Sequence, residues 1–334
     1  MTENVRKQLE LLKSQEYKKH RKHIEDFDAG DSYKATDDAE LFRRFVDTYE
    51  PVFMGDSDRM GFYRSNDIKA NGYEGNVTPN FSYVLANGFK TVRNDIKKSM
   101  DKTTDEDKLK FGRAMLSCIE TVIDFTEKYR RKAEKRDNKD LYNALCKIPE
   151  NRAESFYEAC VFLKLLIFFL RVDFINHLGF GRFDQYMYPY FQNDRKKGIT
   201  DEELFETLEE FFIAINFDTD LYFGLQKGDN GQSMVLGGYD EAGNSCFNDL
   251  TKMCMDASLE LGLIDPKINL RVCDKTPIEV YEYATRLTKQ GLGFPQYCND
   301  DVVIDGLVKL GYSRRCSRLY CCCVPGIYYT GKRR

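Results

Sequence analysis

The chain has 334 residues, of which 42% are hydrophobic and 31% are charged, and its formal net charge is -4. This composition is typical of a soluble protein with room for one large or two modest domains. The mild acidity and the lack of a basic face argue against nucleic acid as a partner. No stretch reaches the roughly 20 apolar residues that cross a bilayer, and the polar N-terminus is unlike a secretion signal. We therefore predict a cytoplasmic protein with no membrane partner.

The first part of the chain, to about Ile148, has the spacing of apolar residues that is typical of helices. Thr103 and Glu106 have the spacing of a capping box, which predicts a long helix from Thr103 to about Lys135. We expect one apolar stripe of this helix in the core, namely Phe111, Met115, Cys118, Ile119, Val122 and Phe125. The segment Ala159–Phe174 is the most apolar of the chain, and we expect it to form a buried core helix.

The segment His177–Tyr186 contains two glycines and is predicted to be a loop. Arg182 and Asp184 lie among its aromatic residues, and we interpret them as an internal ion pair that anchors the loop. A role at a site is the alternative. A single histidine such as His177 more often has a structural hydrogen-bonding role than a catalytic one.

The second half of the chain alternates between helix and strand patterns. Thr200 and Glu203 predict a capped helix that runs to Phe217. The glycine-rich segment Gly228–Ser233 is not followed by Lys-Ser or Lys-Thr, so it does not match a phosphate-binding loop, and we interpret it as a turn that enters a strand. A helix over Asn248–Leu261 follows.

Two more strand–helix pairs follow. Lys267–Val272 is predicted to be a strand, with Ile268, Leu270 and Val272 on one face. Thr276 and Pro277 predict a capped helix that ends at Gly291. A strand at Phe294–Tyr297 and a helix capped by Asn299 complete the pattern. Strands and helices in this alternation predict parallel strands in an α/β sheet or barrel, with the first half as a helical layer and no linker between them.

Four segments, in this order, resemble the glycyl radical enzyme superfamily, the pyruvate formate-lyase-like proteins. They are GRFDQYMYPYF at Gly181–Phe191, GDNGQSMVLGG at Gly228–Gly238, NLRV at Asn269–Val272, and LGFPQYCNDDVVIDGLVKLGYS at Leu292–Ser313. The resemblance runs from about Phe45 to Ser313. It implies an α/β fold in which a helical outer layer surrounds a ten-stranded barrel, of which this chain would contain the first half.

The resemblance also implies a radical mechanism. In this family an activating enzyme that uses S-adenosylmethionine and an iron–sulfur cluster installs a glycyl radical, and a cysteine thiyl radical then abstracts hydrogen from a small-molecule substrate. The barrel shields these radicals from solvent. The expected partners are therefore the activating enzyme, a homodimer partner and the substrate, and we expect no cofactor bound to the chain itself.

The sequence pattern changes after Ser313. Residues 314–334 contain Cys316, Cys321, Cys322 and Cys323, and they do not resemble the family. Read one nucleotide later, however, codons allowed by Arg315–Arg333 can encode a family-like sequence at every position. We hypothesise a frameshifted tail at 314–334, an N-terminal family portion at 1–313, and no C-terminal glycine radical domain. We predict no metal site, because no second Cys or His pair stands near these thiols at ligand spacing.

The shifted reading contains one cysteine with a glutamate two residues later, which resembles the dehydratases and eliminating lyases of the family. We therefore expect the intact enzyme to dehydrate or cleave a small polar substrate. Formate C-acetyltransferase activity is the alternative, and arylacetate decarboxylation is a third. The chain alone is predicted to be inactive because it lacks both radical carriers. A different class of hypothesis is a short non-catalytic protein that pairs with a separate C-terminal chain.

The candidate residues of the substrate cavity are His177, Arg182, Asp184, Gln185, Gln232 and Ser233. By the resemblance, Arg182, Asp184 and Gln185 belong to the barrel scaffold. Gln232 and Ser233 stand at the entrance of a strand, where we expect them to face the cavity. Cys298 is interpreted as a small buried side chain and not as a radical carrier.

Overall fold

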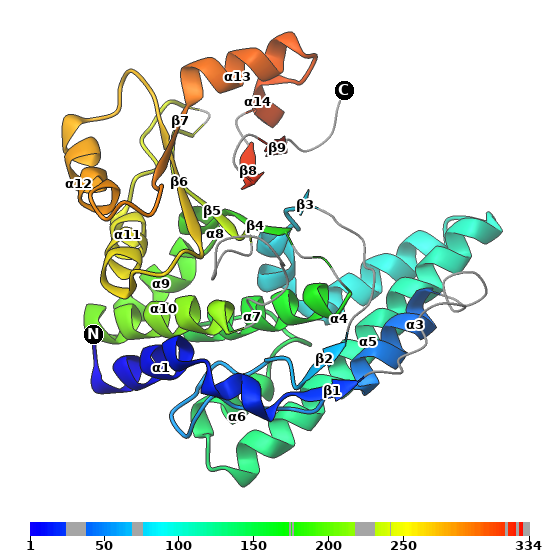
Figure 1. Ribbon diagram of the computed structural model, residues 1–334. Helices are drawn as coiled ribbons and strands as arrows, with labels where there is room; N and C mark the ends of the chain where they lie inside the picture. Colours follow the sequence, from blue (N-terminus) through cyan, green and yellow to red (C-terminus); the bar gives the residue numbers. More distant parts are fainter. Residues whose placement is uncertain are drawn as a thin grey trace. The chain divides into compact units, whose positions relative to one another are not determined.

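A computed structural model describes residues 1–24, 38–68, 76–173, 175, 177–217, 231–240, 242–317, 320–324 and 327–329 (Figure 1). The chain divides into two compact units. We call Thr2–Tyr73 with Asn80–Ile175 the helical unit, and Met1, Glu74–Pro79 and Asn176–Arg334 the sheet unit. The sequence predicted no linker between the two halves, and each of the two units packs mainly against itself.

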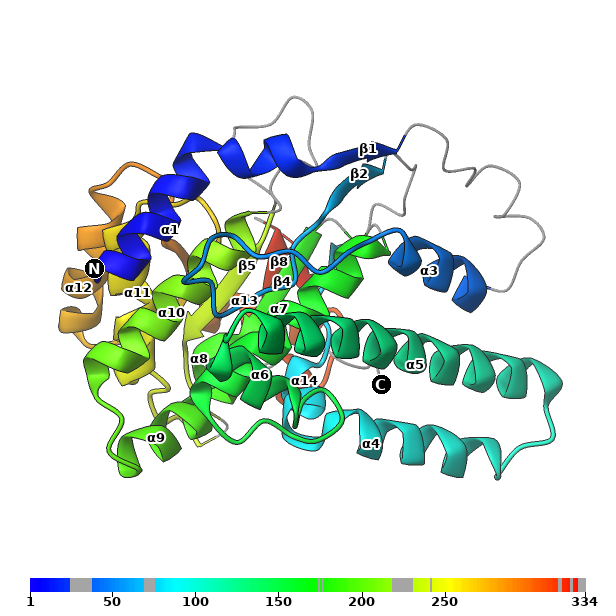
Figure 2. The ribbon, with the colours of Figure 1, turned by 90° about the horizontal axis from the view of Figure 1, so that it is seen from below.

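The helical unit contains most of the elements before residue 175. They are α1 (Glu3–Ser14), η1 (Glu16–His20), α3 (Asp38–Asp47), α4 (Phe81–Met100), α5 (Glu106–Lys135), α6 (Lys139–Leu145) and α7 (Phe156–Val172), with the parallel pair β1 (Lys22–Ile24) and β2 (Asn66–Ile68). The long helices α4 and α5 lie side by side (Figure 2).

Helix α7 is the centre of this unit, as its composition predicts. Most of its residues are buried on all sides. Phe168 lies within 5.1–6.3 Å of four other aromatic rings, those of Tyr49, Phe62, Phe125 and Phe169, measured between ring centroids. No helix in the described residues is both long and apolar enough to cross a membrane.

The start and the apolar stripe of α5 differ from the prediction. Asp105 is the N-cap, and its carboxylate accepts hydrogen bonds from the backbone N–H groups of residues 107 and 108. The predicted capping box was wrong, because Asp105 is nearer the helix and the Thr103 hydroxyl accepts from the Asp105 N–H instead. Ile119, Val122 and Phe125 are buried as expected, but Phe111 is 65% exposed.

The sheet unit contains a five-stranded sheet of parallel strands in the order β3-β4-β5-β6-β7. The strands are β3 (Asn76–Val77), β4 (His177–Arg182), β5 (Ser233–Gly237), β6 (Lys267–Val272) and β7 (Gln296–Asn299). The helices are α8 (Phe183–Tyr186), α9 (Tyr188–Lys196), α10 (Asp201–Asn216), α11 (Asp249–Leu261), α12 (Ile278–Thr288), α13 (Asp300–Lys309) and α14 (Arg314–Ser317). The chain then forms an antiparallel hairpin of β8 (Cys321–Val324) and β9 (Ile327–Tyr329). The predicted parallel α/β arrangement is confirmed.

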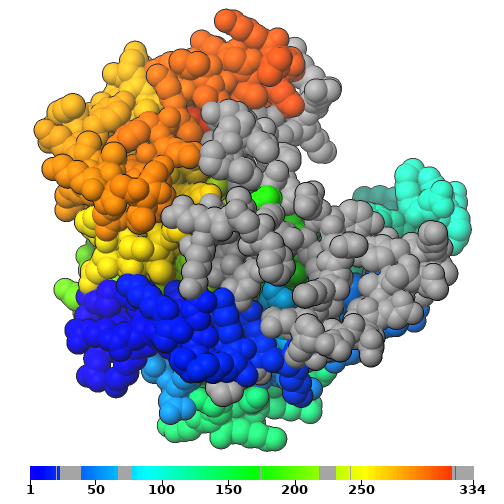
Figure 3. Space-filling view, in the orientation of Figure 1, coloured from blue at the N-terminus to red at the C-terminus, as the bar shows by residue number. Residues whose placement is uncertain are grey.

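Two predicted helix caps in this unit are present. Thr200 and Glu203 form the capping box of α10, and the Asn299 side chain accepts from the Asp301 N–H at the start of α13. In the view of Figure 3, residues of α11, α12 and α13 form the yellow and orange surface.

Three local predictions in the sheet unit were wrong. His177–Arg182 is a strand and not a loop, because it pairs with both β3 and β5. The last strand is Gln296–Asn299 and not Phe294–Tyr297, since its register is set by pairing with β6. Thr276 does not cap α12: its hydroxyl accepts from the Cys273 N–H, and α12 has no side-chain cap.

Candidate functional site

The two faces of the sheet have opposite chemical character. In β6 the apolar residues Ile268, Leu270 and Val272 alternate with Lys267, Asn269 and Arg271, and alternate side chains of a strand point to opposite faces. The apolar face packs against helices; for example, the ring centroids of Phe180 and Phe211 of α10 are 6.0 Å apart.

The other face collects polar groups from four strands. Ser233 pairs with Gly179 and Lys267, Asn269 pairs with Gln296, and Arg271 pairs with Cys298. Paired residues share a face, and the His177 ring lies against Gly231, two residues before Ser233. We call the following set the polar sheet face: His177, Ser233, Asn269, Arg271, Gln296 and Cys298.

Two side chains of the polar sheet face are buried with unused hydrogen-bonding capacity. Ser233 is 0% exposed and Asn269 is 2% exposed. Among the described residues, the Ser233 hydroxyl and the Asn269 Oδ1 have no hydrogen-bond partner, although Asn269 Nδ2 donates to the Lys267 carbonyl at 3.2 Å. Since a buried polar atom without a partner costs about 1–3 kcal/mol, these two oxygens are suited to receive a hydroxyl group of a ligand.

Arg271 is a buried charged group of this face, and its charge is balanced by a carboxylate inside the protein. Its Nε and Nη2 donate to Asp300 Oδ1 and Oδ2 at 2.8 and 2.9 Å. The Tyr320 hydroxyl donates to the same Oδ1 at 2.6 Å, and the Arg271 guanidinium lies 4.3 Å from the Tyr320 ring centroid.

The protonation states of Arg271 and Tyr320 follow from their burial and from the charge of Asp300. Burial by itself lowers the pKa of Arg271, but the Asp300 carboxylate outweighs it and raises the pKa. Burial, and then the negative Asp300, raise the pKa of Tyr320. Arg271 therefore stays charged and Tyr320 stays protonated, as the hydrogen bond to Asp300 requires.

The hairpin β8–β9 follows Tyr320 directly. Strand β8 lies next to β4, β5 and β3 (Figure 1). Because Tyr320 packs on Arg271, the hairpin begins over the polar sheet face. The side chains of Cys321, Cys322 and Cys323 lie outside the described residues, and so does the segment Gly228–Asn230.

Arg182 and Asp184 do not form the predicted ion pair; both bind Gly237 of β5. Arg182 Nη2 donates to the Gly237 carbonyl at 3.0 Å. Asp184 Oδ2 accepts from the Gly237 N–H at 2.7 Å and from the Thr251 hydroxyl at 2.5 Å. Burial raises the pKa of Asp184, against these hydrogen bonds. Gln185 donates to the Cys246 carbonyl at 2.9 Å. These three side chains thus connect α8 and the end of β4 to β5 and to the start of α11.

The two predicted cavity residues at the start of β5 point in different directions. Ser233 belongs to the polar sheet face. Gln232 Nε2 donates to the Ile215 carbonyl of α10 and to Asp265 Oδ2, both at 3.2 Å, so its side chain lies on the helix side of the sheet. Cys298 is buried, as expected, and shares the polar sheet face with Arg271.

One group of potential metal ligands is present in the described part of the chain. Ligand atoms of Cys273, Asp274 and Asp301 lie within 4.8 Å of one another, and the two aspartates are exposed. Asp301 Oδ2 already accepts from the Asp274 N–H at 2.8 Å. Because exposed carboxylates near a loop commonly gather in this way to bind backbone N–H groups, the group does not define a metal centre.

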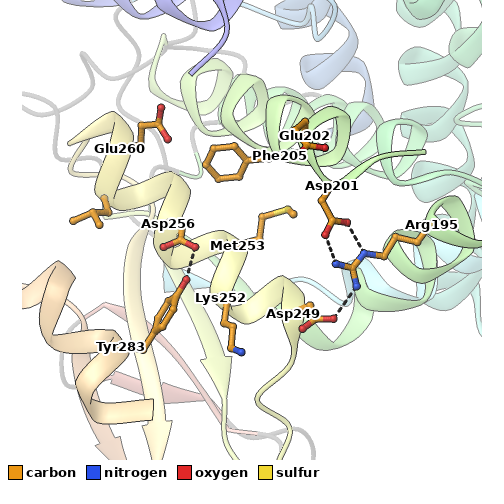
Figure 4. Close-up of a pocket in the computed structure, with 11 residues that line it drawn as sticks. Arg195, Asp201, Glu202, Phe205, Asp249, Lys252, Met253, Asp256, Glu260 and Tyr283 are labelled. Carbon is orange, nitrogen blue, oxygen red and sulfur yellow. Dashed lines mark hydrogen bonds and ion pairs between the residues drawn. The ribbon is translucent and has the colours of Figure 1, made fainter. Parts of the chain in front are cut away.

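A separate open pocket of about 590 Å³ lies among α9, α10, α11 and α12 (Figure 4). Some of its charged side chains pair with each other. Arg195 binds both oxygens of Asp201 at 2.6 Å and Asp249 Oδ2 at 2.7 Å. Tyr283 donates to Asp256, and burial together with this carboxylate raises the pKa of Tyr283 to about 12. The lining also contains Glu202, Lys252 and Glu260, so acidic side chains outnumber basic ones in this pocket.

The buried Glu209 side chain is expected to make the stability of the protein depend on pH. Glu209 lies on α10, one turn after the pocket residue Phe205, and its side chain is 0% exposed. Among the described residues, neither of its carboxylate oxygens has a hydrogen-bond partner. Burial, and then the negative Glu260, raise its pKa from 4.5 to about 7. The folded state thus holds the proton more tightly than the unfolded chain, so stability falls as pH rises from about 4.5 to 7. Between about pH 5 and pH 8, we expect the stability advantage of Glu209→Gln over the parent to grow by ~2 kcal/mol.

Urea denaturation at both pH values measures this difference. Glu202→Gln, an exposed carboxylate on the same helix, is the matched control and should track the parent. An advantage of Glu209→Gln that does not change with pH would contradict the assignment.

Sequence reasoning did not assign roles to Asn269, Arg271, Asp300 and Tyr320. A signal was available for the first two, since Lys267, Asn269 and Arg271 alternate with the predicted apolar face of β6. Asp300 appeared only as a residue near a helix cap. Tyr320 stands in the segment predicted to be non-native, and only the three-dimensional contacts bring it to Arg271.

Comparison with known proteins agrees with the family that the sequence motifs resemble. The family model "Pyruvate formate lyase-like" matches residues 48–331. The chain is 25% identical over 271 residues to (2S)-3-sulfopropanediol dehydratase of Klebsiella oxytoca, covering 74% of this chain and 33% of that protein. It is 27% identical to the 4-hydroxyphenylacetate decarboxylase glycyl radical subunit of Clostridioides difficile, covering 58% and 24%.

Among solved structures, the B12-independent glycerol dehydratase of Clostridium butyricum in its glycerol-bound form aligns with a TM-score of 0.68 and 28% identity. The alignment covers 75% of this chain and 34% of that chain. The chain therefore spans about a third or less of the length of these relatives.

Proposed function

Because the chain belongs to the pyruvate formate lyase-like family of glycyl radical enzymes, we propose that the whole protein dehydrates or cleaves a small polar substrate by radical hydrogen abstraction. The observation that carries this proposal is the family match to dehydratases and a decarboxylase. Formate C-acetyltransferase activity has less support, since the named relatives are not formate acetyltransferases.

The polar sheet face supports a neutral, hydroxylated substrate. Ser233 and Asn269 offer buried oxygens that can accept a hydrogen bond or, for the Ser233 hydroxyl, also donate one. The arginine of this face is already paired with Asp300. Because this guanidinium already binds a carboxylate, it is less available to a sulfonate or carboxylate of a substrate, and the two buried oxygens favour a hydroxylated substrate.

In the proposed reaction, all atoms and electrons of the products come from the substrate. A cysteine thiyl radical takes a hydrogen atom from the carbon that bears one hydroxyl, and the neighbouring hydroxyl leaves with a proton as water. The hydrogen atom then returns, so a 1,2-diol becomes an aldehyde and water without an external oxidant. The hairpin over the polar sheet face would keep solvent from the reacting centre.

The proposal includes the partners that such chemistry requires. An activating enzyme with S-adenosylmethionine and an iron–sulfur cluster would install the glycyl radical, and the protein would act as a homodimer. We further propose that residues 314–334 are read in a shifted frame and that the 334-residue chain alone is inactive.

The test starts from the nucleotide sequence across the codons of Tyr312–Arg334 and downstream. A shifted, uninterrupted frame would support the tail proposal. A stop codon after Arg334 with no related frame beyond it would contradict that proposal and favour a short protein that pairs with a separate chain.

The protein from the uninterrupted frame is then activated under anaerobic conditions and incubated with glycerol or 1,2-propanediol. We expect aldehyde formation that depends on activation, and none from the 334-residue chain. A protein that acquires a radical signal but releases sulfite from isethionate, and no aldehyde from either diol, would overturn the neutral-diol proposal. Failure to acquire a radical would overturn the radical function.

A further inference from the structure

We propose that Arg271, Asp300 and Tyr320 form an anchor that holds the hairpin β8–β9 over the polar sheet face, so that Tyr320 is a positioning residue for the site beneath the hairpin. The role of the anchor in catalysis rests on the proposed function. Its physical role can be tested without any activity.

The anchor joins three elements that are far apart in the sequence. Arg271 comes from β6, Asp300 is the first residue of α13, and Tyr320 immediately precedes β8. The bidentate Arg271–Asp300 pair fixes the guanidinium plane, and Tyr320 contacts both members, through its hydroxyl at 2.6 Å and its ring at 4.3 Å. Since consecutive Cα atoms are about 3.8 Å apart, a fixed Tyr320 also fixes the start of β8.

The surroundings of Tyr320 make this contact specific. The side chain is fully buried, and it shares an apolar cluster with Cys298, Ile304 and Leu307, against which Val303 and Tyr312 pack. A cation–π contact and a charge-assisted hydrogen bond are strongest where water is excluded. The phenol thus has one preferred position.

The hairpin itself needs such support. A two-stranded hairpin is marginally stable alone in water, and β8 lies against β4 and β5 without belonging to their sheet. The anchor supplies a buried polar connection between the base of the hairpin and the sheet. The proposal concerns the chain with the residues that stand at 320–329 in this sequence; the shifted frame also permits tyrosine at the codon that spans Leu319 and Tyr320.

The test is hydrogen exchange of the full chain, compared among the parent, Tyr320→Ala and Tyr320→Phe. We expect Tyr320→Ala to speed exchange of amides in Cys321–Tyr329 by about tenfold or more, with β5 and α11 unchanged. Tyr320→Phe keeps the ring over Arg271 and loses the hydroxyl, so its exchange should be intermediate. Tyr297→Ala, on the neighbouring strand β7 and 41% exposed, is the matched control and should leave the hairpin at the parent rate.

Unchanged exchange of the hairpin amides in Tyr320→Ala would overturn the anchor. Faster exchange spread equally over β5 and α11 would also overturn it, because that result indicates general destabilisation and not a displaced hairpin.

Discussion

Replacing Arg271 by alanine is expected to lower the free energy of unfolding of the sheet unit by about 3–5 kcal/mol. The Arg271 side chain is 0% exposed and the Asp300 side chain is 4% exposed. Removal of the guanidinium leaves a buried carboxylate that, within the described part of the chain, keeps the Tyr320 hydroxyl as a side-chain donor but loses its ion-pair partner. Urea denaturation followed by far-UV circular dichroism measures the loss, and hydrogen exchange in β6 assigns it to the sheet unit.

Two further variants separate this effect from the loss of a large side chain. Removing both charges in Arg271→Met with Asp300→Leu should recover most of the stability, since apolar replacements of a whole buried pair are often neutral. Arg286→Ala breaks a pair with Asp256 in which the side chains are 48% and 40% exposed, and it should cost at most about 1 kcal/mol. An Arg271→Ala loss no larger than that of Arg286→Ala would contradict the argument.

Replacing Phe168 by alanine is expected to lower the free energy of unfolding of the helical unit by about 3–5 kcal/mol. The ring is 0% exposed and is stacked on Phe125 at 5.5 Å between centroids, with an angle of 11° between the ring planes. The truncation removes the transfer free energy of the ring and leaves a cavity among aromatic neighbours that cannot easily close. Urea denaturation, with hydrogen exchange in α7, measures the effect.

Phe111→Ala is the matched control for this prediction. The same residue type is removed from α5, but the ring is 65% exposed, so we expect a change of at most about 0.5 kcal/mol. Equal losses for the two variants would show that Phe111 is buried in solution, as the helical stripe of α5 had predicted, and would contradict the exposure seen in the structure.

Local sequence patterns predicted most of the regular elements correctly. The composition of α7, the capping box at Thr200 and Glu203, and the alternation in β6 each reflect interactions within a few residues, which a sequence displays directly. Competition among nearby caps was less predictable. Asp105 displaced Thr103 at α5, and the Thr276 hydroxyl bonded to Cys273 and not to α12.

The candidate site could be predicted only in part, and Gln232 and Ser233 show why. They are adjacent in the sequence and were both expected to face a cavity. The register of β5 places Ser233 on the polar sheet face, and Gln232 bonds to α10 and Asp265. A shift of one residue reverses the face of a strand residue, and the register is set by partner strands that are distant in the sequence.

The sequence by itself determined the fold class and the family of this protein, because ordered motifs and alternating patterns are local features of the chain. The tertiary structure decided which polar groups meet. It showed that Arg182 and Asp184 both bind Gly237 and do not pair with each other, and it brought Arg271, Asp300 and Tyr320 into one buried cluster. Such contacts depend on strand register and chain reversal over tens of residues, and burial then gives them their strength by excluding water.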